Sequence, residues 1–151
     1  MQYLRSGGST ECFLCEDAVT EDRDGHLLLE RDERILIVMN RYPYNSGHLM
    51  VAPVRHVGDL EELEPAELNR VMKGSIQCLA ALRQTYAPQG FNVGFNLGSA
   101  GGAGVPGHLH LHVVPRWTGD TNFMPVVGAT KVVPEGLDQT YERLKGYFSR
   151  T

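Results

Sequence analysis

His108-Leu109-His110-Leu111-His112-Val113-Val114-Pro115-Arg116 is the stretch of sequence that says most about this chain. Side chains alternate between the two faces of a β-strand, so this pattern places three imidazoles on one face and aliphatic side chains on the other. An ordinary half-buried strand has no packing use for three adjacent imidazoles. The stretch therefore predicts a strand whose polar face carries chemistry.

Two kinds of chemistry are open to three histidines on one strand face. If all three bound one metal ion, the outer two would start with Cα atoms about 13 Å apart, whereas tetrahedral zinc needs each nitrogen about 2 Å away. A division of labour along the strand is easier. A neutral imidazole can attack phosphorus and form a phosphoramidate, and an unperturbed pKa of about 6.5 leaves much histidine neutral at pH 7.

The segment 98–107, directly before the histidines, is rich in glycine. Backbone N–H groups of such a loop could hold phosphate oxygens where charge develops, although glycines also mark ordinary turns.

Hydrophobic periodicity predicts an α+β class with a mostly antiparallel sheet. Residues 27–29 and 35–39 form an expected hairpin, a turn-rich connection covers 40–47, and three further strands are expected at 48–54, 91–97 and 108–115. The clearest helix runs from Pro65 to about Tyr86, and a terminal helix is expected over 137–148. The long helix carries one apolar stripe of Leu68, Val71, Met72, Leu79, Leu82 and Tyr86.

Length and composition narrow the class of protein. A chain of 151 residues is expected to form a single domain, 1–151, with a real hydrophobic core. The net charge of −4 offers no basic footprint for nucleic acid, and no run approaches the roughly 20 apolar residues of a membrane span. The absence of a signal-peptide pattern and only three cysteines favour the cytoplasm.

The alternation of histidine with hydrophobic residues resembles the signature of the histidine-triad (HIT) family. The similarity covers roughly Cys12 to Val133 and keeps the expected order: Asn40, Gly47-His48, the long helix, Asn96 and then the triad. The resemblance implies a HIT-like fold, in which a five-stranded antiparallel sheet is accompanied by one long helix and a C-terminal helix. It also implies a homodimer or a dimer of dimers.

The resemblance also assigns roles to individual residues. His110 would be the nucleophile on the α-phosphate, and His112 would contact the phosphate and orient the His110 ring through its backbone carbonyl. Asn40 would bind the ribose hydroxyls, while His48 and Asn96 would lie near the phosphates.

Gly104-Val105 stands where many relatives carry Gln followed by Ser or Thr. These two residues are expected to lie against the substrate, but without a hydroxyl donor for the leaving group. Together with Pro115-Arg116-Trp117-Thr118-Gly119-Asp120, this departure is similar to the diadenosine-tetraphosphate phosphorylase branch of the family. Members of that branch usually begin with an additional segment bearing Trp and Arg, and whether one precedes Met1 is left open by the sequence.

The expected reaction is therefore nucleotidyl transfer from a dinucleoside polyphosphate through an AMP–His110 intermediate. With inorganic phosphate as acceptor, diadenosine tetraphosphate would give ATP and ADP. The alternatives are a hydrolase of dinucleoside polyphosphates or nucleoside phosphoramidates, and a nucleotide-binding module without turnover. Magnesium bound with the substrate phosphates is compatible with this chemistry, but no protein ligand set points to it.

Cys12-Phe13-Leu14-Cys15 has the spacing of a zinc half-site. Alone, the pair could equally be a redox dithiol or two buried thiols. The family resemblance adds His56 and His108 as the remaining ligands of a structural Zn²⁺ that anchors residues 1–20. Such a closed site has no open coordination position for a reacting water.

Overall fold

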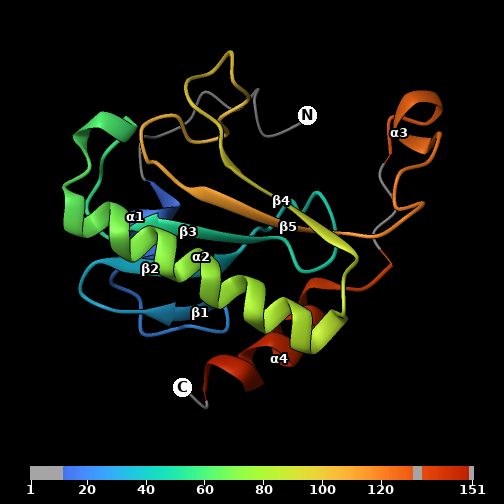
Figure 1. The fold of residues 1–151 in the computed structure, drawn as a ribbon, viewed down its shortest axis with the longest axis horizontal. Coiled ribbons are helices and arrows are strands. Elements are labelled where there is room, and N and C mark those ends of the chain that lie inside the picture. Colours follow the sequence, from blue (N-terminus) through green and yellow to red (C-terminus); the bar gives the residue numbers. More distant parts are fainter. Residues whose placement is uncertain (1–11, 131–133, 150–151) are drawn as a thin grey trace.

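The computed structural model describes residues 12–130 and 134–149. The centre of the fold is one five-stranded antiparallel sheet with the strand order β1-β2-β3-β5-β4 (Figure 1). The elements are α1 (Phe13–Asp17), β1 (Leu28–Arg31), β2 (Ile35–Met39), β3 (Leu49–Pro53), the short 3-10 helix η2 (Leu60–Glu62), α2 (Pro65–Tyr86), β4 (Gly90–Phe95), β5 (Leu111–Arg116), α3 (Met124–Val127) and α4 (Leu137–Phe148). The predicted α+β class, the five strands and the two longer helices are confirmed.

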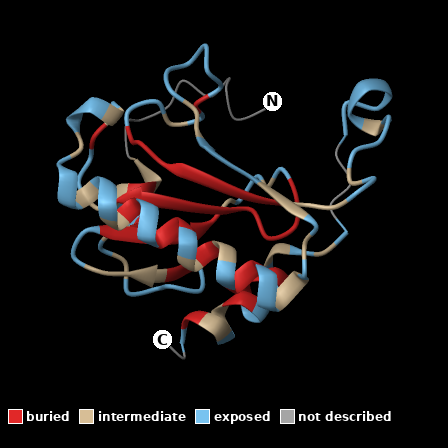
Figure 2. Ribbon diagram, in the orientation of Figure 1, coloured by how far each residue is buried: buried red, intermediate tan, exposed pale blue. Residues whose placement is uncertain are grey.

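The sheet has one thickly covered face and one thinly covered face. Helices α2 and α4 pack on the first, over alternate side chains of the strands, among them Ile35, Ile37, Leu49, Val51, Leu111 and Val113. The opposite face is covered in part by α1, whose Leu14 packs with Leu28, Leu36, Val38, Met50 and Ala52. Figure 2 shows β3 and β5 buried while the outer side of α2 faces solvent.

Helix α2 begins and ends as predicted. Pro65 lies in the first turn, and Glu64 and Glu67 form a reciprocal capping box, which satisfies two of the free N–H groups there. The buried side of the helix differs from the predicted stripe, because Leu68 and Met72 are exposed and the residues against the sheet include Val71, Cys78 and Leu82.

Strand β5 begins three residues later than predicted. His108, Leu109 and His110 precede it, because β3 pairs with β5 only from Leu49 to Val51 and then ends at a proline, which has no N–H to donate. Leu109 N–H donates to the carbonyl of Val57 instead. The predicted alternation still holds beyond this point, since Leu111 and Val113 face α2.

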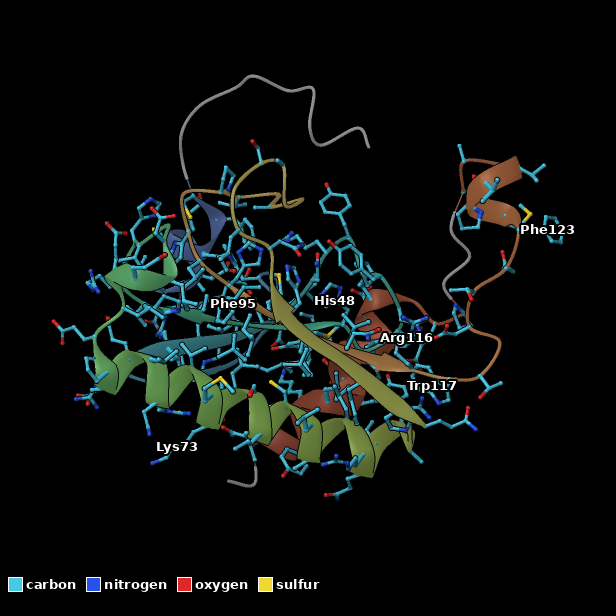
Figure 3. All side chains as sticks on the ribbon, turned by 45° about the horizontal axis from the view of Figure 1, so that its top comes forward. His48, Lys73, Phe95, Arg116, Trp117 and Phe123 are labelled. Carbon is cyan, nitrogen blue, oxygen red and sulfur yellow. The ribbon has the colours of Figure 1, made fainter. Side chains whose placement is uncertain are left out.

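A segment with exposed side chains follows β5 and carries α3. Its apolar side chains Phe123, Val126 and Val127 are largely exposed, and Figure 3 shows Phe123 well away from the sheet. Within the described ranges, none of the helices is both long enough and apolar enough to cross a bilayer.

Candidate active site and metal centre

The turn between β2 and β3 places His48 beneath the triad. Gly47 adopts a φ of +80°, and a Cβ there would lie 2.9 Å from a methyl of Leu82, so both its conformation and its close approach to α2 require glycine. The tight turn brings His48 to the position directly before β3, with its ring beside His112. Figure 3 shows His48 near the centre of the molecule.

His110 presents one nitrogen as a nucleophile. Its Nδ1 lies 2.8 Å from the carbonyl oxygen of His108, and because a carbonyl only accepts, Nδ1 must carry the proton. The lone pair of the neutral ring is therefore on Nε2. The resemblance implied that the carbonyl of His112 orients this ring, but the structure shows the carbonyl of His108 in that place. The reason is that the chain turns before β5 and points the His108 carbonyl back at the His110 ring.

Hydrogen bonds also fix the tautomers of His48 and His112. The backbone N–H of Tyr44 donates to His48 Nδ1 at 3.0 Å, so the His48 proton lies on Nε2. The Nε2–H of His48 in turn donates to His112 Nδ1 at 2.9 Å. The proton of a neutral His112 therefore lies on Nε2, which makes this atom a donor.

His48 is buried next to His112 and is paired on both sides of its ring. Its side chain is only 1% exposed, and both ring nitrogens have protein partners. The expected place of His48 near the phosphates therefore stays a prediction, and we expect any effect of His48 on a substrate to pass through His112.

Burial keeps the triad histidines neutral. Desolvation lowers the pKa values of His108 and His110, and it lowers the pKa of His112 to about 4, with a smaller contribution from His110. The His110 and His112 rings lie edge to face with centroids 4.8 Å apart. Two neutral imidazoles thus stand side by side at pH 7, one offering a lone pair and the other an N–H.

Two asparagine side chains contact the histidines of this site, one at His48 and one at His112. Asn40, directly after β2, has its Nδ2 3.4 Å from His48 Nδ1. Asn96, directly after β4, places its Nδ2 3.3 Å from His112 Nε2 and 3.5 Å from the Tyr44 hydroxyl. The structure thus brings Asn40 and Asn96, both predicted from the sequence, to the same site as His110 and His112.

The glycine-rich loop contacts the first histidine of the triad through its backbone. Gly104 is exposed and Val105 is half-buried, and the carbonyl of Val105 accepts from the N–H of His108. Among the described residues, no hydrogen bond links either residue to His110 or His112, so their contact with a substrate remains a prediction.

Tyr44 joins this site although its sequence position predicts only a place in a turn. Its ring stacks on His112 at 5.7 Å between centroids and lies 4.7 Å from the ring of His48. A tyrosine four residues before a buried histidine is a weak signal, and only the fold shows that the two rings meet.

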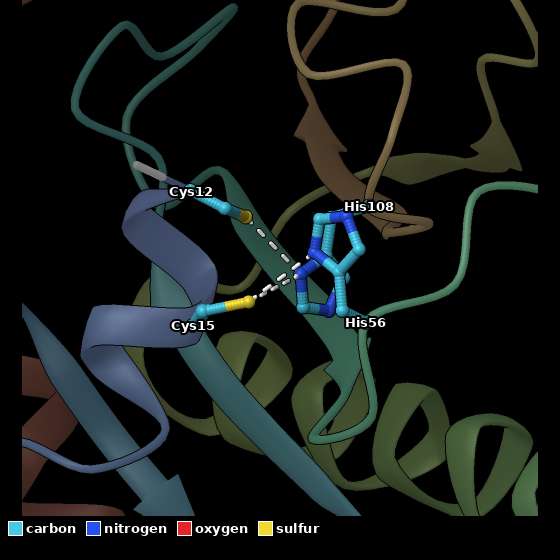
Figure 4. A group of neighbouring side chains, drawn as sticks. All are labelled: Cys12, Cys15, His56 and His108. Atoms are coloured by element: carbon cyan, nitrogen blue, oxygen red, sulfur yellow. Dashed lines mark hydrogen bonds between the residues drawn. The ribbon is translucent and has the colours of Figure 1, made fainter. Parts of the chain in front are cut away.

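A second cluster lies next to the triad and involves its first histidine. Cys12 and Cys15, at the N-terminus and within the first turn of α1, face His56 and His108 (Figure 4). Cys12 Sγ is 3.2 Å from His108 Nδ1, and Cys15 Sγ is 3.2 Å from His56 Nδ1 and 3.5 Å from His108 Nδ1. All four ligand atoms lie within 4.8 Å of one another, so the cluster could hold a metal ion.

The donor set and its surroundings fit a tetrahedral ion. Sulfur and nitrogen ligands bound at about 2.3 and 2.1 Å stand about 3.6 Å apart in a tetrahedron, close to the spacings found here. His108 Nε2 lies 2.8 Å from the Pro53 carbonyl, so its proton is on Nε2 and its lone pair on Nδ1 faces the sulfurs. Among the described residues, no other group of three or more potential metal ligands is found.

Comparison with known proteins agrees with this geometry. The family model of the HIT domain matches residues 22–119. The chain belongs to the HIT domain family. This HIT chain is 42% identical over 129 residues to the AP-4-A phosphorylase of Mycobacterium tuberculosis strain H37Rv. The match covers 85% of the chain and 66% of that protein, so the chain spans just under two thirds of this relative's length.

A more distant sequence relative and a solved structure are also similar to this chain. The asymmetrical bis(5'-nucleosyl)-tetraphosphatase of Schizosaccharomyces pombe is 30% identical over 82 residues, which covers 54% of this HIT chain and 44% of the yeast protein. A Zn-bound histidine triad family protein from Mycobacterium smegmatis has the same fold, with a TM-score of 0.72 and 24% identity, over 95% of this chain and 96% of the other.

Proposed function

We propose that this chain transfers AMP from a dinucleoside polyphosphate, through His110, to inorganic phosphate. The observation that carries the proposal is the His110 ring, which is neutral, 7% exposed, and held by the His108 carbonyl so that Nε2 keeps its lone pair. The similarity to an AP-4-A phosphorylase supports diadenosine tetraphosphate as substrate.

The first step is attack of His110 Nε2 on the α-phosphorus. A nitrogen–phosphorus bond forms, and the bond between the α-phosphorus and the oxygen that bridges to the β-phosphate breaks. The oxygen keeps the electron pair and leaves as part of ATP. The Nδ1 proton stays on the ring, where the carbonyl of His108 stabilises the positive charge that the ring acquires. His112 Nε2–H and Asn96 Nδ2 donate to the phosphate oxygens.

The second step returns the enzyme to its starting state. An anionic oxygen of inorganic phosphate attacks the same phosphorus, the nitrogen–phosphorus bond breaks, and its electron pair returns to Nε2. ADP leaves, and Asn40 releases the ribose hydroxyls that it held. Water in place of phosphate would release AMP instead.

Zinc belongs to the second cluster in this proposal. Zn²⁺ held by Cys12, Cys15, His56 and His108 would fix α1 to the segment directly before β5, and its role would be structural. The whole chain, 1–151, would then form one HIT domain with its first 20 residues anchored by the ion, although 1–11 lie outside the described residues. Magnesium bound with the substrate phosphates stays a prediction.

The active form is inferred to be a homodimer. On the outer side of α2, Leu68, Met72 and Ile76 follow each other at four-residue spacing and are exposed, and β4 is an edge strand with an exposed Val93. Light scattering should give twice the monomer mass. The pair of substitutions Met72→Glu and Ile76→Glu should lower that mass, while Val19→Glu, at an exposed valine elsewhere, should not.

Product analysis with diadenosine tetraphosphate tests the proposed reaction. With phosphate present, the expected products are ATP and ADP, and without phosphate little turnover is expected. AMP and ATP in both conditions would make the chain a hydrolase. No cleavage under either condition, together with no binding of AMP, would overturn the assignment.

A further inference from the structure

We propose that the phenol of Tyr44 is a catalytic residue that donates a hydrogen bond to a phosphate oxygen of the bound nucleotide. The inference rests on the proposed function, because it concerns a substrate held at the same site. It adds to this site a residue from the β2–β3 turn.

Tyr44 is the exposed member of an otherwise buried group. Its side chain is 48% exposed, whereas His48, His110 and His112 are all 7% exposed or less. The ring lies nearly parallel to the His112 ring, with an angle of 26° between the two planes. One side of the phenol is therefore held by the histidines, and the rest is open to a ligand.

Three donors lie close together at His112, whose ring contacts that of His110. The hydrogen-bond relay from the backbone of Tyr44 through His48 makes His112 Nε2 a donor. Asn96 Nδ2, with the amide nitrogen turned toward both groups, lies 3.3 Å from that atom. It also lies 3.5 Å from the Tyr44 hydroxyl, to which it donates, so the phenolic proton is left to donate elsewhere.

Such an arrangement suits an anion. The N–H groups of Asn96 and His112, 3.3 Å apart, are both donors and cannot hydrogen-bond to each other. A single oxygen that faces both groups can accept from each, and the phenol of Tyr44 lies next to Asn96. A phosphate has several acceptor oxygens, and hydrogen bonds to an ionised acceptor are stronger than those between neutral groups. The phenol also supplies a hydroxyl, which neither Gly104 nor Val105 has.

Tyr44→Phe separates the hydroxyl from the ring. The variant keeps the stacking on His112 and the backbone bond to His48, so its melting temperature should stay within about 2 °C of the wild type. Turnover of diadenosine tetraphosphate should fall roughly 10- to 100-fold. This loss is smaller than that expected on removing a fully buried oxyanion donor, because Tyr44 is half exposed. Tyr42→Phe, which removes a phenol from the same turn, is the matched control and should change turnover less than twofold.

Binding of AMP and adenosine by calorimetry identifies what the hydroxyl contacts. Tyr44→Phe should weaken AMP at least fivefold and leave adenosine unchanged, since only AMP carries a phosphate. Equal weakening of both ligands, or no change in AMP binding and turnover, would overturn the role given to Tyr44 while leaving the reaction in place. If the wild type neither binds AMP nor cleaves diadenosine tetraphosphate, the proposed function fails, and the role of Tyr44 fails with it.

Discussion

His108 and His110 are two residues apart, yet their rings carry the proton on opposite nitrogens. His108 donates from Nε2 to the Pro53 carbonyl and turns Nδ1 toward the cysteines. His110 donates from Nδ1 to the His108 carbonyl and keeps a lone pair on Nε2. Burial lowers the pKa of both, so both rings are neutral.

The difference between the two rings lies in their partners and not in their chemistry. A carbonyl oxygen can only accept, so whichever ring nitrogen faces it must hold the proton, and the other nitrogen becomes a ligand or a nucleophile. Two sulfurs face the lone pair of His108, which suits a metal ion. No such partner is described for Nε2 of His110, which suits attack on a substrate.

His110→Asn should remove the reactive lone pair and leave the His108 cluster in place. Asparagine keeps polarity and about the same reach, but it has no nitrogen lone pair that can form the phosphoramidate, so turnover should fall at least about 10⁴-fold. Quenched-flow product analysis with diadenosine tetraphosphate measures the loss.

AMP binding and zinc content should persist in His110→Asn. Acid-quenched wild type should carry a covalently bound AMP group, detected by mass spectrometry, and the variant should carry none. Turnover by the variant at the wild-type rate would show that His110 is not the nucleophile.

Cys15→Ser should break the comparison on the metal side. Wild-type protein purified without chelator should contain about one zinc per chain, and the variant less than a tenth of that amount. Loss of the ion should lower the free energy of unfolding by about 3 kcal/mol, or roughly 10 °C in melting temperature, because α1 is no longer tied to His108.

Cys78→Ala is the matched control, since Cys78 is a buried thiol in the core rather than part of the cluster. It should keep its zinc. A zinc content that is the same in wild type and Cys15→Ser would rule out the Cys2His2 site.

Local patterns in the sequence predicted most of the fold. Strand β2 and helix α2 occupy the predicted residues, because hydrophobic periodicity, Pro65 and the capping glutamates are all local signals. The start of β5 was predicted three residues too early. Nothing within residues 108–115 indicates that β3 stops at Pro53, since the length of a ladder depends on its partner strand.

The site was less accessible to sequence reasoning than the fold. The triad could be recognised from its alternation, and the pairing of Cys12 and Cys15 with His56 and His108 followed from family resemblance. Two features depend on hydrogen bonds that form only in the folded chain: which carbonyl contacts the His110 ring, and that the His48 ring is bonded to His112. Tyr44 meets His112 across 68 residues of sequence, so no local pattern predicts their contact.

His48→Phe and His48→Gln sharpen the comparison because they change the donor to His112 Nδ1 and leave the three triad histidines in the sequence. Phenylalanine leaves His112 Nδ1 without its donor, so His112 is free to adopt the wrong tautomer, and kcat should fall about 30-fold. Glutamine has an amide oxygen that can accept from Tyr44 N–H and an amide nitrogen that can donate to His112, and it should restore kcat to within about threefold of the wild type.

The measurement is kcat and KM for both variants at saturating phosphate, with melting temperature as a check on folding. An effect on KM alone would indicate that His48 serves binding and not the state of His112. Equal loss in both variants would show that the fit of the ring, rather than its hydrogen bonds, is what matters.

The smallest expected effect is on the rate between pH 8 and pH 6.5. A histidine whose pKa is lowered stays neutral down to its lowered value, so protonation removes the His110 lone pair only below 6.5, and His112 is protonated only near pH 4. Transfer of AMP to His110 in a single turnover should therefore change less than about twofold over this range and decline at lower pH. Single-turnover transfer is the right measurement, because inorganic phosphate itself changes charge near neutrality and would distort the profile of the complete reaction. A rate that already halves above pH 7 would mean that His110 titrates like an exposed histidine, and the contrast between two buried, neutral rings would no longer explain their different tasks.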